Sequence, residues 1–107
     1  MREISDRLLY DFYGGLLNGR AAEIMSMRLN EDLSLSEIAD AVNITKQGAK
    51  NYIDRSLRKI REIEAKTGAH AKYRRAADFL RECAQELSEG ADAQKAAEKI
   101  DGFLKEY

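Results

Sequence analysis

Apolar side chains recur at intervals of three and four residues along the chain, and its 107 residues include no proline. That spacing places the apolar side chains on one face of an α-helix, and proline is the residue that most often interrupts one. We therefore predict an all-α fold of five to six helices. The length is typical of one compact helical domain over residues 1–107, with a core that needs no metal or disulfide.

Capping residues and glycines set the bounds of the predicted helices. The first helix carries Gly14 and Gly15, each of which weakens it by about 1 kcal/mol relative to alanine. Asn18 is predicted to cap the next helix, and Ser34 and Glu37 have the spacing of a capping box. The predicted helices run from about Ser5 to Leu17, from Asn18 through Leu29, from Ser34 through Val42, from Thr45 to Thr67, from residue 70 to 88, and from Asp92 to the C-terminus.

Apolar stripes on these helices identify the side chains that are expected to pack together. The helix after Asn18 has a stripe of Ala22, Met25, Met27 and Leu29. The helix over 70–88 has a stripe of Tyr73, Ala76, Ala77, Leu80, Cys83, Ala84 and Leu87.

Residues 35–54 fit the helix-turn-helix pattern. Ala39 supplies the small residue that is needed where the second helix crosses the first at close range. Four positions later Asn43 supplies a turn residue that tolerates the left-handed backbone conformation. Thr45 is an N-cap for the second helix, whose first turns enter the major groove in such proteins. The apolar anchors of the crossing are Ile38, Val42, Ile44, Ala49 and Tyr52. A plain helical hairpin is the alternative interpretation.

The net charge of −1 conceals an uneven distribution of charge. Residues 1–44 carry four basic and eight acidic side chains (−4), and residues 76–107 carry the same numbers (−4). Between them, residues 45–75 carry ten basic and three acidic side chains (+7). A block of one sign indicates a surface for a polyanion, although a solvated helix face is an equally good interpretation of charge alone. The block begins at Thr45, where the second helix of the pattern begins.

The segment from Leu17 to about Gly68 resembles region 4 of sigma factors. The chain is also similar to the YlxM-like family, through "LLYDFYGGLL", "NEDLSLSEIAD", Thr45-Lys46-Gln47 and "DRSLRKIREIEAKTG". This resemblance implies a sigma-region-4-like helix-turn-helix part over 18–67. It also implies a link with the signal recognition particle, because genes of this family lie beside those of the particle. The expected roles are regulation of that protein-targeting pathway or participation in it.

Seven polar or basic residues are predicted to bind nucleic acid. Lys46 and Lys50 are suited to donate to guanine O6 and N7, and Gln47 or Asn51 is suited to pair with adenine N6 and N7. Arg55 and Arg58 lie further along the helix and are predicted to neutralise phosphates. The seven are Thr45, Lys46, Gln47, Lys50, Asn51, Arg55 and Arg58. Lys59 and Arg61 are instead interpreted as surface residues that pair with acidic neighbours.

Enzymatic activity, a metal site and a cofactor find no support in the sequence. The only histidine is His70, and it has neither a second histidine nor a paired cysteine for a metal site. No arrangement around His70 singles out a serine or cysteine as a nucleophile that the histidine would activate, so we predict no catalytic residues. The chain shows no apolar run of a signal peptide or membrane span, and Cys83 cannot form an internal disulfide. We expect a soluble, cytoplasmic protein that does not enter membranes.

Residues 70–107 form a predicted C-terminal pair of helices with two interpretations. Their alanine-rich stripes either pack back onto the first helices or form a homodimer, which would space two recognition helices. We favour the homodimer because the predicted recognition helix, Thr45 to Thr67, is longer than a small core would cover. An alternative to DNA binding is an interaction module that binds structured RNA or protein of the signal recognition particle. The acidic flanks and Gly48, which loosens the start of the recognition helix, favour this alternative.

Overall fold

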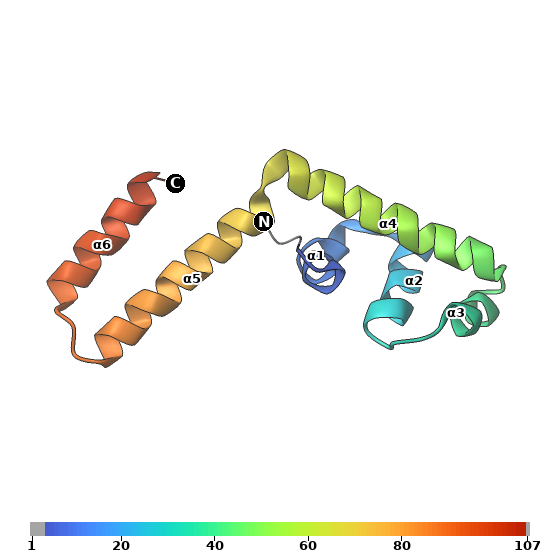
Figure 1. Ribbon diagram of the computed structural model, residues 1–107, viewed down its shortest axis with the longest axis horizontal. Coiled ribbons are helices and arrows are strands. Elements are labelled where there is room, and N and C mark those ends of the chain that lie inside the picture. Colours follow the sequence, from blue (N-terminus) through green and yellow to red (C-terminus); the bar gives the residue numbers. More distant parts are fainter. Residues whose placement is uncertain (1–3, 107) are drawn as a thin grey trace. The chain divides into compact units, whose positions relative to one another are not determined.

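A computed structural model describes residues 4–106, and helices make up most of them (Figure 1). The all-α prediction is confirmed, since the described residues form six α-helices and one short 3₁₀ turn and contain no strand. The elements are α1 (Asp6–Tyr13), η1 (Gly14–Leu16), α2 (Gly19–Leu29), α3 (Leu35–Val42), α4 (Lys46–Thr67), α5 (Ala69–Ser88) and α6 (Ala93–Glu106). No helix within 4–106 combines the length and the apolar character needed to cross a bilayer.

The chain divides into two compact units between His70 and Ala71. The first contains α1 to α4 and the second contains most of α5 and all of α6. One domain over residues 1–107 stays a prediction, as do the parts predicted over 18–67 and 70–107. The last residue of the latter part, Tyr107, lies outside the described residues.

The first helix ends earlier than predicted. The α-helix stops at Tyr13, and Gly14–Leu16 continue as the 3₁₀ turn η1, closed by a hydrogen bond from Leu17 N–H to Gly14 O at 3.0 Å. Two successive glycines favour this change, because they stabilise α-helix poorly and a last turn readily tightens to 3₁₀ geometry. Gly14 also lies against the ring of Tyr10, which would be 3.1 Å from an added Cβ.

Four α-helices of the first unit have a polar N-cap residue, and three of these residues make a side-chain capping hydrogen bond. Ser34 Oγ accepts from Glu37 N–H at 3.1 Å while a Glu37 carboxylate oxygen accepts from Ser34 N–H at 3.0 Å, which completes the capping box. Ser5 caps α1 and Thr45 caps α4 in the same way, through Leu8 N–H and Gly48 N–H. Asn18 occupies the N-cap position of α2, but its side chain makes no capping hydrogen bond.

The core of the first unit joins α2, α3 and α4. Ile24, which the predicted stripe of α2 omits, is completely buried together with Met25 and Ile38. Since α2 packs against both α3 and α4, its buried face is wider than one stripe. Burial of each such side chain stabilises the fold by about 1.5–3 kcal/mol. The buried residues of this core are Leu17, Ile24, Met25, Ile38, Ala39, Val42, Ala49 and Ile53.

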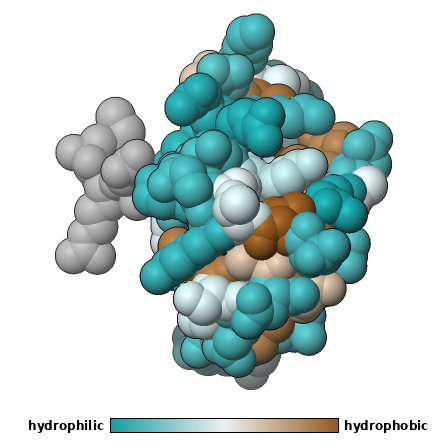
Figure 2. Space-filling model, turned by 90° about the vertical axis from the view of Figure 1, so that its right-hand side faces the viewer, coloured by the Kyte–Doolittle hydropathy of each residue, from teal (hydrophilic) through white to brown (hydrophobic). Residues whose placement is uncertain are grey.

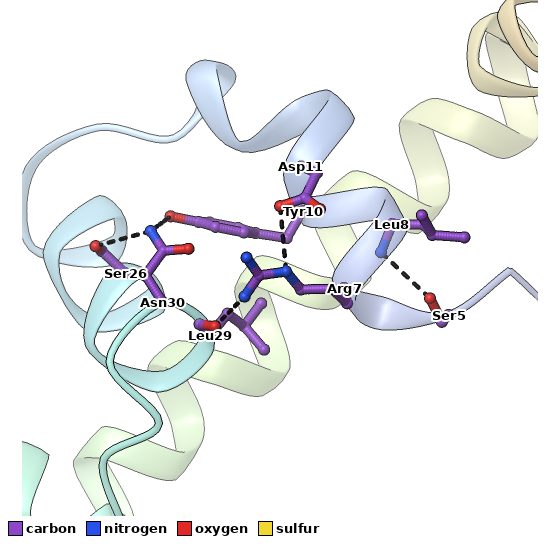
Figure 3. A network of polar contacts seen from close by, with 8 residues as sticks. All are labelled: Ser5, Arg7, Leu8, Tyr10, Asp11, Ser26, Leu29 and Asn30. Atoms are coloured by element: carbon purple, nitrogen blue, oxygen red, sulfur yellow. Dashed lines mark hydrogen bonds and ion pairs between the residues drawn. The ribbon is translucent and has the colours of Figure 1, made fainter.

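Polar contacts hold α1 against the end of α2 (Figure 3). Arg7 donates to the carbonyl of Leu29 and pairs with Asp11, its own helix neighbour, at 3.3 Å. Tyr10 Oη accepts from the side-chain amide of Asn30 at 3.5 Å. A second small core, formed by Leu9, Tyr13 and Ile60, packs α1 against α4. The first unit is thus held together by apolar packing and by hydrogen bonds between its helices.

The second unit is a helical hairpin with a small apolar interface. Phe79 stacks on Phe103 with ring centroids 4.2 Å apart, and Cys83 and Ala96 are buried. Phe79 is absent from the predicted stripe of this helix. It enters the interface because the side of α5 that carries Phe79 and Cys83 packs on α6, whereas Leu80 is 55% exposed.

Candidate nucleic-acid interface

The turn between α3 and α4 has the geometry that the helix-turn-helix pattern requires. Asn43 adopts the left-handed conformation, with φ 56° and ψ 53°. Ala39 is buried where the helices cross, and its carbonyl accepts from Ile44 N–H at 3.0 Å. The asparagine directs the chain sharply into Thr45, whose hydroxyl accepts from Gly48 N–H at 2.9 Å and starts α4. Ala39, Asn43 and Thr45 therefore take the structural roles that their spacing in the sequence predicts.

All seven residues predicted to bind nucleic acid are exposed. They lie at the N-cap and along the first four turns of α4, opposite the buried stripe of Ala49, Ile53 and Ile60. Figure 2 views the end that carries α3 and the start of α4 in Figure 1, and hydrophilic side chains cover most of that face. The structure brings these side chains together on one helix that is anchored by the core.

The side chains of this surface contact one another. Gln47 Nε2 donates to Asn51 Oδ1 at 3.0 Å, and Arg55 Nε donates to the backbone carbonyl of Asn51 at 3.3 Å. Lys50 Nζ lies 2.8 Å from Asp54 Oδ2, with both side chains about half exposed. Exposed i, i+4 pairs contribute only about 0.3–0.5 kcal/mol, so a ligand can replace them at small cost.

Three of the predicted cations have no ion-pair partner within residues 4–106, namely Lys46, Arg55 and Arg58. The structure distinguishes the two cations interpreted as surface residues. Arg61 pairs with Asp6 of α1 and donates to Ile4 O at 3.1 Å. Lys59 differs from its interpretation, since it makes no ion pair with any residue of the described range and lies in a groove beside Ser56. Sequence reasoning gave Ser56 no functional role.

The arrangement of α3, the turn and α4 defines the chain as a helix-turn-helix protein. A family model described as "Putative helix-turn-helix protein, YlxM / p13 like" (UPF0122) matches residues 2–100. The chain belongs to this family.

Curated relatives of similar length support the assignment. A "UPF0122 protein" of Desulforamulus reducens is 34% identical over 100 residues, covering 92% of this chain and 86% of the relative. "UPF0122 protein STH1464" of Symbiobacterium thermophilum is 39% identical over 89 residues, covering 83% and 82% of the two chains. "UPF0122 protein BH2485" of Halalkalibacterium halodurans is 31% identical over 96 residues, covering 90% and 84%. The resemblance to the YlxM-like family is therefore confirmed.

Proposed function

We propose that this protein binds duplex DNA through the exposed face of α4 and acts as a regulatory protein. The observation that carries the proposal is a capped recognition helix whose exposed first turns bear only polar and basic candidates for contact. An α-helix fits the major groove of B-DNA, where every base pair presents a distinct pattern of donors and acceptors.

Each side chain has a role that follows from its chemistry and its place on α4. Lys46 and Lys50 donate to guanine O6 and N7, and Gln47 and Asn51 pair with adenine. Arg55 and Arg58 bind phosphates further along the helix. Because Lys50 leaves Asp54 and Gln47 leaves Asn51 on binding, these contacts replace weak intramolecular ones.

We propose further that the protein is a cytoplasmic homodimer whose second unit supplies the interface, so that two recognition helices address two half-sites. Leu80 and Leu104, at 55% and 64% exposed, support this role for α5 and α6. Sedimentation of the full chain over a range of concentrations tests it, and a monomer throughout would contradict it. Regulation of the signal recognition particle pathway, or participation in it, rests on the resemblance alone.

The experiment on DNA binding starts from genomic fragments selected by the full chain. Lys46→Ala/Lys50→Ala should lower affinity for these fragments at least about tenfold, because each lost base contact costs about 1–3 kcal/mol. Lys95→Ala/Lys105→Ala removes the same charge from α6 and should leave affinity nearly unchanged. Equal effects of the two double variants would contradict the proposal.

A competition separates this function from the alternative of an interaction module for the signal recognition particle. The acidic flanks and Gly48, in the first turn of α4, are the observations that favour the alternative. Selected duplex DNA should displace the particle's RNA from the protein if DNA is the main partner. Retention of the RNA or of the particle's protein in excess duplex would favour the alternative instead.

A further inference from the structure

A groove with a volume of about 270 Å³ lies between the start of α2 and the middle of α4. It belongs entirely to the first compact unit. Two of its lining side chains are cations and none is a carboxylate, so its charge favours an anion. The lining residues are Leu17, Asn18, Ala21, Tyr52, Arg55, Ser56 and Lys59.

The first turn of α2 reaches this groove without a side-chain cap. Asn18 makes no capping hydrogen bond, and the first bond of the helix runs from Ala22 N–H to Asn18 O at 3.3 Å. The N–H groups of Gly19, Arg20 and Ala21 precede that bond and have no hydrogen-bond partner in the part of the chain that the structure describes. Free N–H groups and the helix dipole together favour an anion at such a position.

Ser56 is an independent sign of a ligand. Its side chain lines the groove although the residue is only 4% exposed, and it lies on the buried stripe of α4 between Ile53 and Ile60. A serine within a helix often donates to the carbonyl four residues earlier. Ser56 makes no such bond, and its hydroxyl has no partner within residues 4–106. Its oxygen is not one of the fully buried unpaired atoms of the described residues, so the hydroxyl is open to the groove and can donate to a ligand there.

The two cations of the groove are available to a ligand. Lys59 has no ion-pair partner within the described range of the chain. The guanidinium of Arg55 lies 5.2 Å from the centroid of the Tyr52 ring, and its Nε donates to Asn51 O. The guanidinium carries a planar set of donors, which suits two oxygens of one oxyanion.

We propose that this groove binds a phosphate group. The N–H groups at the start of α2 and the Ser56 hydroxyl donate to its oxygens, while Arg55 and Lys59 balance its charge. The phosphate is either a backbone phosphate of DNA, a source that rests on the proposed function, or part of a free phosphorylated compound. Both sources offer the same oxygen acceptors to the same donors.

Titration of the full chain with inorganic phosphate, followed by amide NMR, tests the site. We expect saturable shifts at Gly19, Arg20, Ala21 and Ser56 that chloride of equal ionic strength does not reproduce. Lys59→Gln should weaken phosphate binding about tenfold, as expected for loss of one charged contact. Lys66→Gln, which removes the same charge from the last turn of α4, should have little effect. Shifts that follow ionic strength alone, or equal effects of the two variants, would overturn the proposal.

Ala21→Glu provides a second variant that preserves the fold. Ala21 occupies the third position of α2, where a glutamate caps the helix and places a negative charge in the groove. It should abolish the phosphate-induced shifts, whereas Gln94→Glu on α6, with the same change in charge, should retain them. Phosphate binding that survives Ala21→Glu would also overturn the proposal.

DNA affinity of the same variants distinguishes the two sources. A loss of affinity in Ala21→Glu beyond that in Gln94→Glu assigns the site to a backbone phosphate. Unchanged DNA affinity, with phosphate-induced shifts lost, assigns it to a free phosphorylated compound. If the wild-type chain saturates with phosphate but binds no DNA, the proposed function fails while the phosphate site stands.

Discussion

The two compact units bury their apolar side chains to very different extents. In the first unit, Leu9, Ile24, Met25, Ile38 and Ile60 are almost completely buried. In the second, the buried apolar residues of the described chain are Cys83 and Ala96, and the hairpin otherwise depends on one aromatic stack and on exposed ion pairs such as Arg75–Glu106. Exposed ion pairs contribute about 0–1 kcal/mol each. The difference indicates that α4 is anchored by an extensive apolar core, while the hairpin has low local stability.

Ile24→Ala is expected to have the largest effect on this contrast. Removal of a fully buried side chain leaves a cavity, so the free energy of unfolding should fall by about 2–5 kcal/mol. Denaturant unfolding followed by circular dichroism measures this loss. Leu16→Ala, at a position that is 56% exposed, should cost far less and serves as the control. Similar losses from both substitutions would mean that the core of the first unit is not what stabilises the chain.

Phe79→Ala is expected to destabilise the second unit by about 1–3 kcal/mol. It removes the stack on Phe103 and the contact of Lys99 Nζ with the ring, 5.6 Å from its centroid. Hydrogen exchange should become faster in α5 and α6 and stay unchanged in α2 to α4. Lys95→Ala, at an exposed position of α6, should change neither set of amides. Faster exchange throughout α2 to α4 would show that the first unit depends on the hairpin.

Acidification is expected to have the smallest effect, and to act on the first unit through its capping box. A hydrogen bond from the backbone N–H of Ser34 lowers the pKa of Glu37 below its ordinary value of 4.5, and a second bond with the Ser34 side chain acts in the same direction. The carboxylate therefore stabilises the folded state above that value and loses its contribution as pH falls through the lowered pKa.

The free energy of unfolding measured from neutral to acid pH tests this contribution. Glu37→Gln keeps a hydrogen-bond acceptor without the charge, so its stability should fall less steeply than that of the wild type. Glu23→Gln on α2 is the matched loss of an acidic side chain. If Glu37→Gln and the wild type lose stability in parallel, the capping box is not sensitive to pH.

The helix-turn-helix was predictable from sequence because its requirements are local. A small residue at 39, a left-handed turn at 43 and a cap at 45 each leave a mark in the sequence, and the structure confirms these features. The end of α1 at Tyr13 was missed because two glycines only weaken a helix. The close contact of Gly14 with the Tyr10 ring depends on the folded backbone.

Long-range packing explains the other misses. Ile24 is buried because α2 contacts two helices at once. Phe79 lies in the interface because it is on the side of α5 that packs on α6, where it stacks on Phe103. The groove beside Ser56 and Lys59 forms where α2 begins against the middle of α4. A serine on an otherwise apolar stripe was the available signal, but the uncapped turn that faces it lies more than thirty residues earlier in the chain.

The dependence of DNA affinity on salt tests the central claim most directly. If Arg55 and Arg58 neutralise phosphates, the logarithm of the affinity should fall linearly with the logarithm of salt concentration. The slope is about −0.9 for each phosphate contact, and Arg58→Gln should reduce its magnitude by about one contact. A response that does not vary with salt, or a slope that Arg58→Gln leaves unchanged, would contradict binding of duplex DNA through this face of α4.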